Sequence, residues 1–273
     1  MTHRLTVTAL ALVVLLCFVT SMAHADATAY SITSANQFGT IDLITGVFTP
    51  IGNTGTRLLG LGSAGGNVYS GTFLQNTLYQ INVSNGSATS IGQASPLFFY
   101  DGFGSTAGAL FGVDTLSQDL YSINPSTGAS TLVGPTGLEP GAVDGMSAGA
   151  GGLFLAELTG SGDVLYNLNT STGAATIIGN TSLSFIAAMV WVDGTLYAVN
   201  SVSNSSVSVW TLNTTTGAAT FVANTSGDGN NATLGLAPAL ASTPEPSSFI
   251  LLGYGLLAAL GALRRQYIPL AHR

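Results

Sequence analysis

The residues that could carry out chemistry are few between positions 26 and 243, the stretch that remains when both apolar termini are set aside. This stretch has no His, no Cys and no Lys, and Arg57 is its one basic side chain. A Ser-His-Asp triad and a His-ligated zinc or iron site are therefore excluded. The remaining candidates are carboxylates, among them Asp101, Asp114, Asp119, Asp144, Glu157, Asp163 and Asp193. No pair of these stands out as the two acids that a glycosidase needs across a cleft, so we nominate no catalytic and no cofactor-binding residue.

Asp101 and Asp144 are the carboxylates with equivalent surroundings, since each precedes Gly at the head of a short predicted strand. Facing one another, they could bind Ca²⁺ together with main-chain oxygens, which makes calcium the one cofactor to consider. The alternative is that both carboxylates shape Asp-Gly bends. The chain is built of repeats, and its other copies lack an acid at this place. No ring of metal ligands forms, so the structural interpretation is favoured.

Charge is scarce and mostly negative. Of 273 residues, 6% are charged and 46% hydrophobic, and the formal net charge is −7. In residues 26–243, eleven acids stand against one arginine, a net charge of −10. This balance excludes a nucleic-acid binder, which needs a basic face to neutralise phosphates, and the apolar content argues against a charged disordered chain. An acidic surface rich in Thr and Asn instead suits contact with extracellular polysaccharide and not with anionic membranes.

A repeat of about 43 residues, in the range of β-propeller blades, must position these side chains. Five equivalent glycines, which we call the ladder glycines, are spaced by 40, 42, 45 and 44 residues: Gly46, Gly86, Gly128, Gly173 and Gly217. A second, independent set of aromatic residues, spaced by 39, 42, 43 and 43, consists of Tyr30, Tyr69, Phe111, Phe154 and Tyr197. Two sets that agree five times indicate five copies of one structural unit.

The repeated polar residues have a structural explanation. An Asx residue lies four positions before each ladder glycine, namely Asp42, Asn82, Asn124, Asn169 and Asn213. Asx side chains cap their own turn, and Gly supplies the positive φ where a hairpin reverses. The aromatic residues seven positions before four of the glycines are Tyr79, Tyr121, Tyr166 and Trp210. We expect these to pack between repeats, with a sugar-stacking platform as the alternative.

Each repeat contains four short β-branched or aromatic segments separated by Gly, Asn, Asp and Ser clusters, the pattern of short strands. The first copy lacks its first strand, and residues 231–236 near the end read as that strand, because Thr233-Leu234-Gly235-Leu236 echoes Leu58-Leu59-Gly60-Leu61. Four-stranded units at this period close into a ring. The sequence therefore predicts an all-β fold over residues 26–243, a five-bladed β-propeller of four-stranded blades closed by its N- and C-terminal strands.

The N-terminus has the pattern of a secretory signal peptide. Arg4 precedes an apolar stretch at residues 5–19, and Ala23 and Ala25 form a small-x-small cleavage site. Cys17, the only cysteine, lies in this stretch and would leave with it. We therefore expect a signal helix in residues 1–25, removed after export by the Sec machinery.

The C-terminus has a more specific order of features. Pro244, Glu245 and Pro246 precede an uncharged run at residues 249–263, which is followed by Arg264 and Arg265. The run predicts a transmembrane helix with its arginines on the cytoplasmic side, and residues 267–273 form a short tail. This order resembles the PEP-CTERM sorting signal over residues 244–266. The resemblance implies that an exosortase-type transpeptidase in the inner membrane of a Gram-negative bacterium recognises and removes the tail, and that the producing organism makes extracellular polysaccharide.

Three functions are compatible with these features. The first is a non-enzymatic cell-surface or extracellular-matrix protein, held briefly in the inner membrane by its C-terminal helix and then released or attached outside the cell. The second is a module that binds a glycan or another protein through loops on one propeller face. The third is a polysaccharide hydrolase or lyase that uses carboxylates and Ca²⁺. The scarcity of catalytic side chains favours the first.

Overall fold

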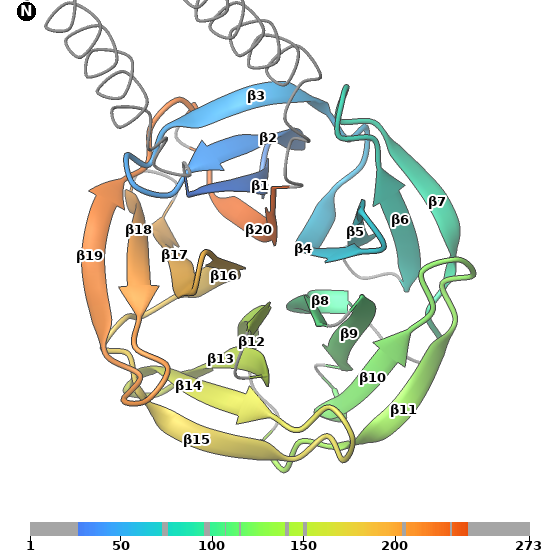
Figure 1. Cartoon of the computed structure of the whole chain (residues 1–273), viewed down its shortest axis with the longest axis vertical. Helices are drawn as coiled ribbons and strands as arrows, with labels where there is room; N and C mark the ends of the chain where they lie inside the picture. Colours follow the sequence, from blue (N-terminus) through green and yellow to red (C-terminus); the bar gives the residue numbers. More distant parts are fainter. Residues whose placement is uncertain are drawn as a thin grey trace, which may run out of the picture. The chain divides into compact units, whose positions relative to one another are not determined.

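The strands form five four-stranded antiparallel sheets, arranged as blades around a common centre (Figure 1). The computed structural model describes residues 27–72, 76–95, 99–106, 108–114, 116–139, 142–149, 152–203, 206–229 and 231–239. The regular elements within these residues are all strands, so the predicted all-β, five-bladed propeller is confirmed. The predicted signal helix in residues 1–25 and the transmembrane helix in residues 249–263 lie outside the described residues.

The blades are numbered along the chain, and each runs from an innermost strand at the centre to an outermost strand at the rim. In that order, blade 1 consists of β20 (Thr233–Pro238), β1 (Thr28–Thr33), β2 (Gln37–Asp42) and β3 (Phe48–Asn53). Blade 2 consists of β4 (Leu58–Ala64), β5 (Asn67–Thr72), β6 (Thr77–Ile81) and β7 (Ala88–Gln93). Blade 3 consists of β8 (Phe99–Thr106), β9 (Ala109–Asp114), β10 (Asp119–Ile123) and β11 (Ser130–Pro135). Blade 4 consists of β12 (Ala142–Gly149), β13 (Gly152–Thr159), β14 (Gly162–Leu168) and β15 (Ala175–Asn180). Blade 5 consists of β16 (Ile186–Val192), β17 (Thr195–Ser203), β18 (Ser206–Leu212) and β19 (Ala219–Asn224).

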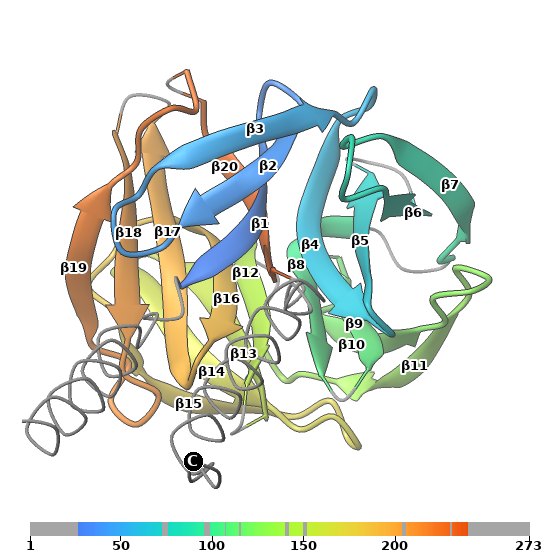
Figure 2. The same cartoon turned by 45° about the horizontal axis from the view of Figure 1, so that its top comes forward.

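Blade 1 joins the two ends of the repeat region. Strand β20 pairs with β1 in antiparallel register, with Ser31 opposite Leu236 and Tyr30 opposite Ala237. Figure 2 shows the completed blade lying between β17 on one side and β4 on the other. Closure by both termini confirms the predicted ring, and it ensures that residues 27–238 contain every strand pairing of the propeller.

The hairpin between the third and fourth strands of each blade contains the predicted Asx-Gly turn. In blade 2, Asn82 Oδ1 accepts a hydrogen bond from the backbone N–H of Ser84 at 2.9 Å, and Gly86 has a φ of 76°. The same capping bond is made by Asp42, Asn124, Asn169 and Asn213. The recurring Asn and Gly residues therefore shape turns, as the repeat predicted.

The ladder glycines have a second role that their spacing did not reveal, since they allow neighbouring blades to touch. A Cβ atom on Gly86 would lie 2.8 Å from the carbonyl carbon of Gly52, in the outermost strand of the preceding blade. The equivalent pairs are Gly128 with Gly92, Gly173 with Gly134, and Gly217 with Gly179. In the last such contact, Gly46 of blade 1 meets the backbone of Asn224 in blade 5, so the same device closes the ring.

The hydrophobic core lies between the blades. Each of five buried clusters draws its side chains from two neighbouring blades. Tyr79, Tyr121, Tyr166 and Trp210 each pack in or against one of these clusters, which confirms the prediction that they pack between repeats. A single blade could not bury both of its faces, so the packing makes the blades stabilise one another.

Candidate functional site

Asp101 and Asp144 belong to the innermost strands of two adjacent blades, β8 and β12, which lie against each other. Both residues fall where the pairing with the second strand shifts register, between Phe99 and Phe103 in one blade and between Val143 and Gly145 in the other. The two aspartate side chains lie outside the described part of the structure. The calcium site therefore stays a prediction. Among the residues that are described, no three His, Cys, Asp or Glu side chains gather where they could hold a metal ion.

Two of the other acids have structural partners. Asp114 Oδ1 accepts hydrogen bonds from the backbone N–H groups of Leu116 at 2.8 Å and Ser117 at 2.9 Å, so it caps the turn after β9. The carboxylate of Asp163, which is fully buried, accepts a hydrogen bond from the backbone N–H of Ile186. That bond ties β14 of blade 4 to β16 of blade 5.

Glu157 is an acid whose pKa is raised by its surroundings. It is buried on β13, and burial together with the charge of Glu139 raises its pKa, while a hydrogen bond to Tyr166 acts in the opposite direction. Burial and the charge of Glu157 in turn raise the pKa of Tyr166. Glu157 on β13 and Tyr166 on β14 thus form a coupled pair within blade 4. Glu139, which lies on the loop before β12, was not among the acids that the sequence singled out.

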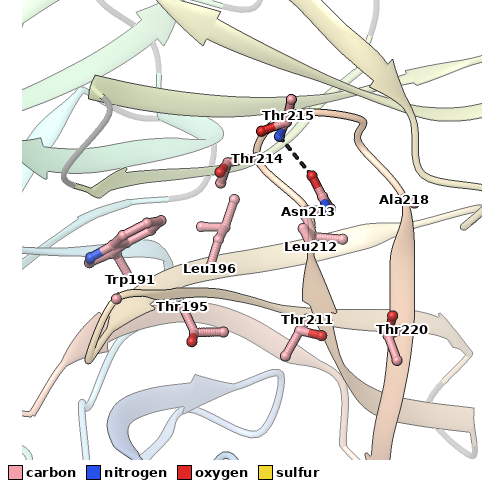
Figure 3. A pocket seen from close by; sticks show the side chains of 11 residues that line it. Trp191, Thr195, Leu196, Thr211, Leu212, Asn213, Thr214, Thr215, Ala218 and Thr220 are labelled. Carbon is pink, nitrogen blue, oxygen red and sulfur yellow. Dashed lines mark hydrogen bonds between the residues drawn. The ribbon is translucent and has the colours of Figure 1, made fainter.

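A pocket of about 390 Å³ lies at one end of blade 5, between the β16–β17 hairpin and the β18–β19 hairpin (Figure 3). It is lined by Trp191, Gly194, Thr195, Leu196, Thr211, Leu212, Asn213, Thr214, Thr215, Ala218 and Thr220. Its size falls in the ~300–1,000 Å³ range of small-molecule sites. The turn between β16 and β17 is a tight one, because Asp193 and Gly194 both have positive φ, at 47° and 83°, as in the two-residue turns that suit hairpins.

The lining divides into an apolar side and a hydroxyl side. Trp191 and Leu196 are opposite each other on β16 and β17, so their side chains share one face of the sheet. Thr211 and Thr220 are opposite each other on β18 and β19. Since side chains alternate along a strand, Thr195 lies on the face opposite Leu196. The pocket therefore reaches both faces of the blade at its end.

Trp191 is held by the neighbouring blade. Its ring stacks on Phe154 with centroids 6.0 Å apart and an interplanar angle of 8°. A Cβ atom on Gly149 would clash with the indole, so the absence of a side chain at Gly149 makes room for the ring. Phe154 and Gly149 both belong to blade 4, and the indole is therefore fixed against that blade at the rim of the pocket.

The C-terminal segment matches a family model described as the PEP-CTERM protein-sorting motif, over residues 242–266. The chain carries a PEP-CTERM sorting motif. This motif implies export through the cell envelope and processing by an exosortase. The match covers the predicted motif residues Pro244, Glu245, Pro246, Arg264 and Arg265. These residues, like the predicted signal-peptide residues Ala23 and Ala25, lie outside the described structure.

Solved structures resemble this PEP-CTERM protein in fold. The match to the crystal structure of a nidogen/laminin complex has a TM-score of 0.58 and 11% identity, and covers 79% of this chain and 99% of that one. A match to Kuenenia stuttgartiensis hydrazine synthase has a TM-score of 0.44 and 13% identity, over 59% of this chain and 47% of that one. No curated protein matches the sequence. At these identities the first likeness shows the propeller fold alone.

No helix among the described residues of the PEP-CTERM protein has the length and apolar character needed to cross a membrane. The helix that the sequence predicts for this purpose, in residues 249–263, belongs to the sorting motif itself and lies beyond those residues.

A small cavity lies among the innermost strands of blades 1 to 4. The cavity there has a volume of about 10 Å³, and it is lined by Leu61, Gly62, Gly104, Ser105, Met146, Ser147, Leu236 and Pro238. Such a space holds one water molecule at most. The innermost strands approach closely because small residues face their neighbours; for example, a Cβ atom on Gly62 would lie 2.7 Å from the Phe103 ring.

The lining of the blade 5 pocket is uncharged. None of its lining side chains ionises near neutral pH, so it offers no general acid, base or activated nucleophile. It offers instead an indole and several hydroxyl and amide groups. Trp191 was not nominated from the sequence, but a signal was present. At the equivalent place on the innermost strand, the other blades have Ser63, Ser105, Ala148 and Pro238.

Proposed function

We propose that this protein is a non-enzymatic binding protein of the cell surface or extracellular matrix. In this proposal, the Sec machinery exports it from a Gram-negative bacterium after a cut beyond Ala25. Residues 249–263 then anchor it in the inner membrane until an exosortase-type transpeptidase removes the tail. The observation that carries the proposal is the PEP-CTERM motif at residues 242–266, because a sorting motif of this kind implies that the domain before it works outside the cytoplasm.

The composition of the propeller supports a role without catalysis. Residues 26–243 contain no His, Cys or Lys. Asp114 and Asp163 have structural partners. The pocket of about 390 Å³ at the end of blade 5 has no ionisable lining residue. A propeller of similar fold occurs in a nidogen/laminin complex, and this supports binding to a protein as the alternative to binding a glycan.

The test uses residues 26–243, which hold every strand pairing of the ring. This protein is applied to a glycan array and to matrix extracted from the producing strain, and the same polysaccharides are assayed for new reducing ends and unsaturated products. We expect retention without product release. Release of sugars that tracks the folded protein would overturn the non-enzymatic role, and would favour the carboxylate-dependent hydrolase or lyase instead.

A second test addresses the sorting route. Mass spectrometry of the protein from the culture medium and from the membrane fraction should show an N-terminus after Ala25 and a C-terminus near residues 244–246. A protein that leaves the cell with residues 249–263 still attached would contradict processing by a transpeptidase.

A further inference from the structure

We propose that the hairpin between β2 and β3 of blade 1 contacts the lipid surface of the inner membrane while the chain is anchored there. Its contact residues are Ile44 and Val47, which we call the blade 1 tip. This inference rests on the proposed anchoring by residues 249–263, and it adds to that anchoring an interaction surface on the propeller. Three observations carry it: a break in the repeat, the place where the chain leaves the ring, and the distribution of charge.

The blade 1 tip is apolar where the equivalent hairpins are polar or small. Ile44 and Val47 are 49% and 45% exposed, whereas Leu43 and Phe48 of the same hairpin belong to a buried cluster. The other blades have Ser84, Ser126, Ser171 and Thr215 at the place of Ile44, and Ser87, Ala129, Ala174 and Ala218 at the place of Val47. The Asx-Gly turn therefore forms without large apolar side chains, and the two exposed aliphatic residues are a departure specific to blade 1.

The hairpin that carries the tip is fixed by its neighbours. Leu43 is fully buried, and its N–H donates a hydrogen bond to the carbonyl of Ala27 at 2.7 Å. The N–H of Phe48 donates to the carbonyl of Ser226 at 2.8 Å, in the segment that follows blade 5. The tip is therefore presented in a fixed shape, so little conformational entropy is lost when it meets another surface.

The chain leaves the ring on the same blade and at the same end. Strand β1 begins beside the end of β2, where Thr28 pairs with Asp42. Strand β20 ends beside the beginning of β1, where Pro238 pairs with Ala29. The end of β20 is thus two strand spacings from the end of β2, about 10 Å at the ordinary spacing. We call this end of the ring the exit end, and the blade 1 tip lies on it.

The length of the connecting segment keeps the exit end near the bilayer. Residues 239–248 join β20 to the predicted membrane helix, and these ten residues reach roughly 33–36 Å when fully extended. To turn the opposite end of the ring to the bilayer, the segment would first have to cross a four-stranded blade, about 14 Å. It would then have to run along the ring for the length of an innermost strand of six to eight residues, about 20–26 Å. That path uses the whole reach of the segment, so the exit end faces the membrane.

The distribution of charge favours the same orientation. Five described acids lie at the opposite end, near the turns between second and third strands or on the loop before a first strand: Asp114, Asp119, Glu139, Glu157 and Asp163. The described acids in hairpins at the exit end are Asp42 and Asp193. The carboxylate of Asp42 accepts hydrogen bonds from the backbone N–H groups of Ile44 at 2.8 Å and Thr45 at 3.0 Å. An anionic lipid surface therefore repels the exit end least.

The experiment uses the chain from residue 26 to its C-terminus, reconstituted through its tail into vesicles of phosphatidylethanolamine and phosphatidylglycerol that contain a nitroxide-labelled lipid. Cys17, the only cysteine, lies in the predicted signal peptide, so a single introduced cysteine carries a fluorophore without background. Thr45→Cys places the label beside the tip. Thr127→Cys is the matched control at the same turn position of blade 3, because both threonines are exposed and accept the equivalent backbone hydrogen bond. We expect the lipid to quench the label at position 45 and to leave the label at position 127 bright.

A second variant tests the apolar contact itself. Ile44→Ser combined with Val47→Ser gives the hairpin the residues that blade 2 has at Ser84 and Ser87, so the turn should form as it does there. We expect this double variant to lose most of the quenching at position 45. Its melting temperature without lipid should match that of the parent protein, which shows that the loss is not due to misfolding.

Flotation of the vesicles reports the anchoring separately. Protein that floats, with quenching at position 45 that exceeds quenching at position 127 and is lost in the double serine variant, supports the inference. Equal quenching at the two positions overturns the orientation, and quenching that the double variant retains overturns the apolar contact; both results leave the proposed anchoring intact. Protein that does not float contradicts the anchoring, and the inference with it.

Discussion

Replacing Gly86 by alanine tests how the blades are joined. Gly86 has a φ of 76° and its missing Cβ faces the backbone of Gly52 in the preceding blade. Gly66, in the same blade, has a φ of 77°, and a Cβ there would meet nothing within 4 Å. The two positions have the same φ and differ in whether another blade is in the way. The pair of variants Gly86→Ala and Gly66→Ala therefore separates the cost of the turn from the cost of the contact.

The magnitudes follow from the geometry. An alanine at positive φ costs about 1–2 kcal/mol, and both variants incur this. In Gly86→Ala the new methyl would also lie 2.8 Å from the Gly52 carbonyl carbon and 3.0 Å from its Cα, whereas carbon atoms normally approach to ~3.5–4.0 Å. The blades must move apart, and such overpacking costs about 1–3 kcal/mol more. For a domain of this size each kcal/mol lowers Tm by about 2–4 °C.

Thermal unfolding of residues 26–243 followed by circular dichroism provides the measurement. Gly86→Ala should melt lower than Gly66→Ala by about 2–12 °C, the range that the extra 1–3 kcal/mol predicts. Equal melting temperatures for the two variants would mean that the ladder glycines serve the hairpins alone, and that the close approach of Gly86 to Gly52 contributes nothing to the ring.

Three further predictions concern acidity, calcium and sorting. Because the pKa of Glu157 is raised in the folded protein, its contribution to stability is complete below its ordinary pKa of 4.5 and is lost as the pH rises through the raised value. Glu157→Gln should therefore have the wild-type Tm near pH 4 and a higher Tm than the wild type at pH 7, as measured by thermal melts at both pH values. Equal Tm values for variant and wild type at both pH values would contradict the raised pKa. If Asp101 and Asp144 bind Ca²⁺, millimolar calcium should raise Tm, and the Asp101→Asn, Asp144→Asn double variant should abolish that rise. A wild-type Tm that calcium leaves unchanged would contradict the calcium site. Replacing Arg264 and Arg265 by Glu should disturb membrane retention and tail removal, seen by immunoblot of membrane and medium fractions, and normal processing of this variant would count against the sorting mechanism.

Much of the fold could be predicted because the same turn residues recur at a regular spacing in every repeat. Each blade needs a hairpin between its third and fourth strands. In blade 2, Asn82 and Gly86 form this hairpin's capped turn, which the residue types alone identify. The echo between Leu58-Leu59-Gly60-Leu61 and the strand that ends the ring was enough to place β20 beside β1. Local turn chemistry and a period therefore determined both the blade and the way the ring closes.

The contacts between blades could not be predicted in the same way, because they join residues far apart in the sequence whose meeting depends on the curvature of the whole ring. The ladder glycines were explained by their turns, and nothing in a turn indicates that Gly86 must also clear Gly52. A recurring contact within a blade, made by Thr136 in blade 3, was missed for another reason. The Thr136 hydroxyl and N–H bind the carbonyl of Gln118 at 2.6 Å and 3.1 Å, and Thr54, Thr181 and Thr225 repeat the arrangement, yet this set of threonines reads in the sequence as ordinary polar composition.

The candidate site was missed for a related reason. A search for repeated residues finds what every blade needs, and in this chain the recurring Asn, Gly, Thr and aromatic residues are accounted for by turns, by ties within a blade and by packing between blades. A site formed at the end of a single blade instead departs from the equivalence of the blades. Trp191 does so where the other blades have Ser, Ala or Pro, and Gly149 on the adjoining blade leaves the space that its indole fills. The residues that depart from a repeat are thus the better guide to its function, and the residues that obey it are the better guide to its fold.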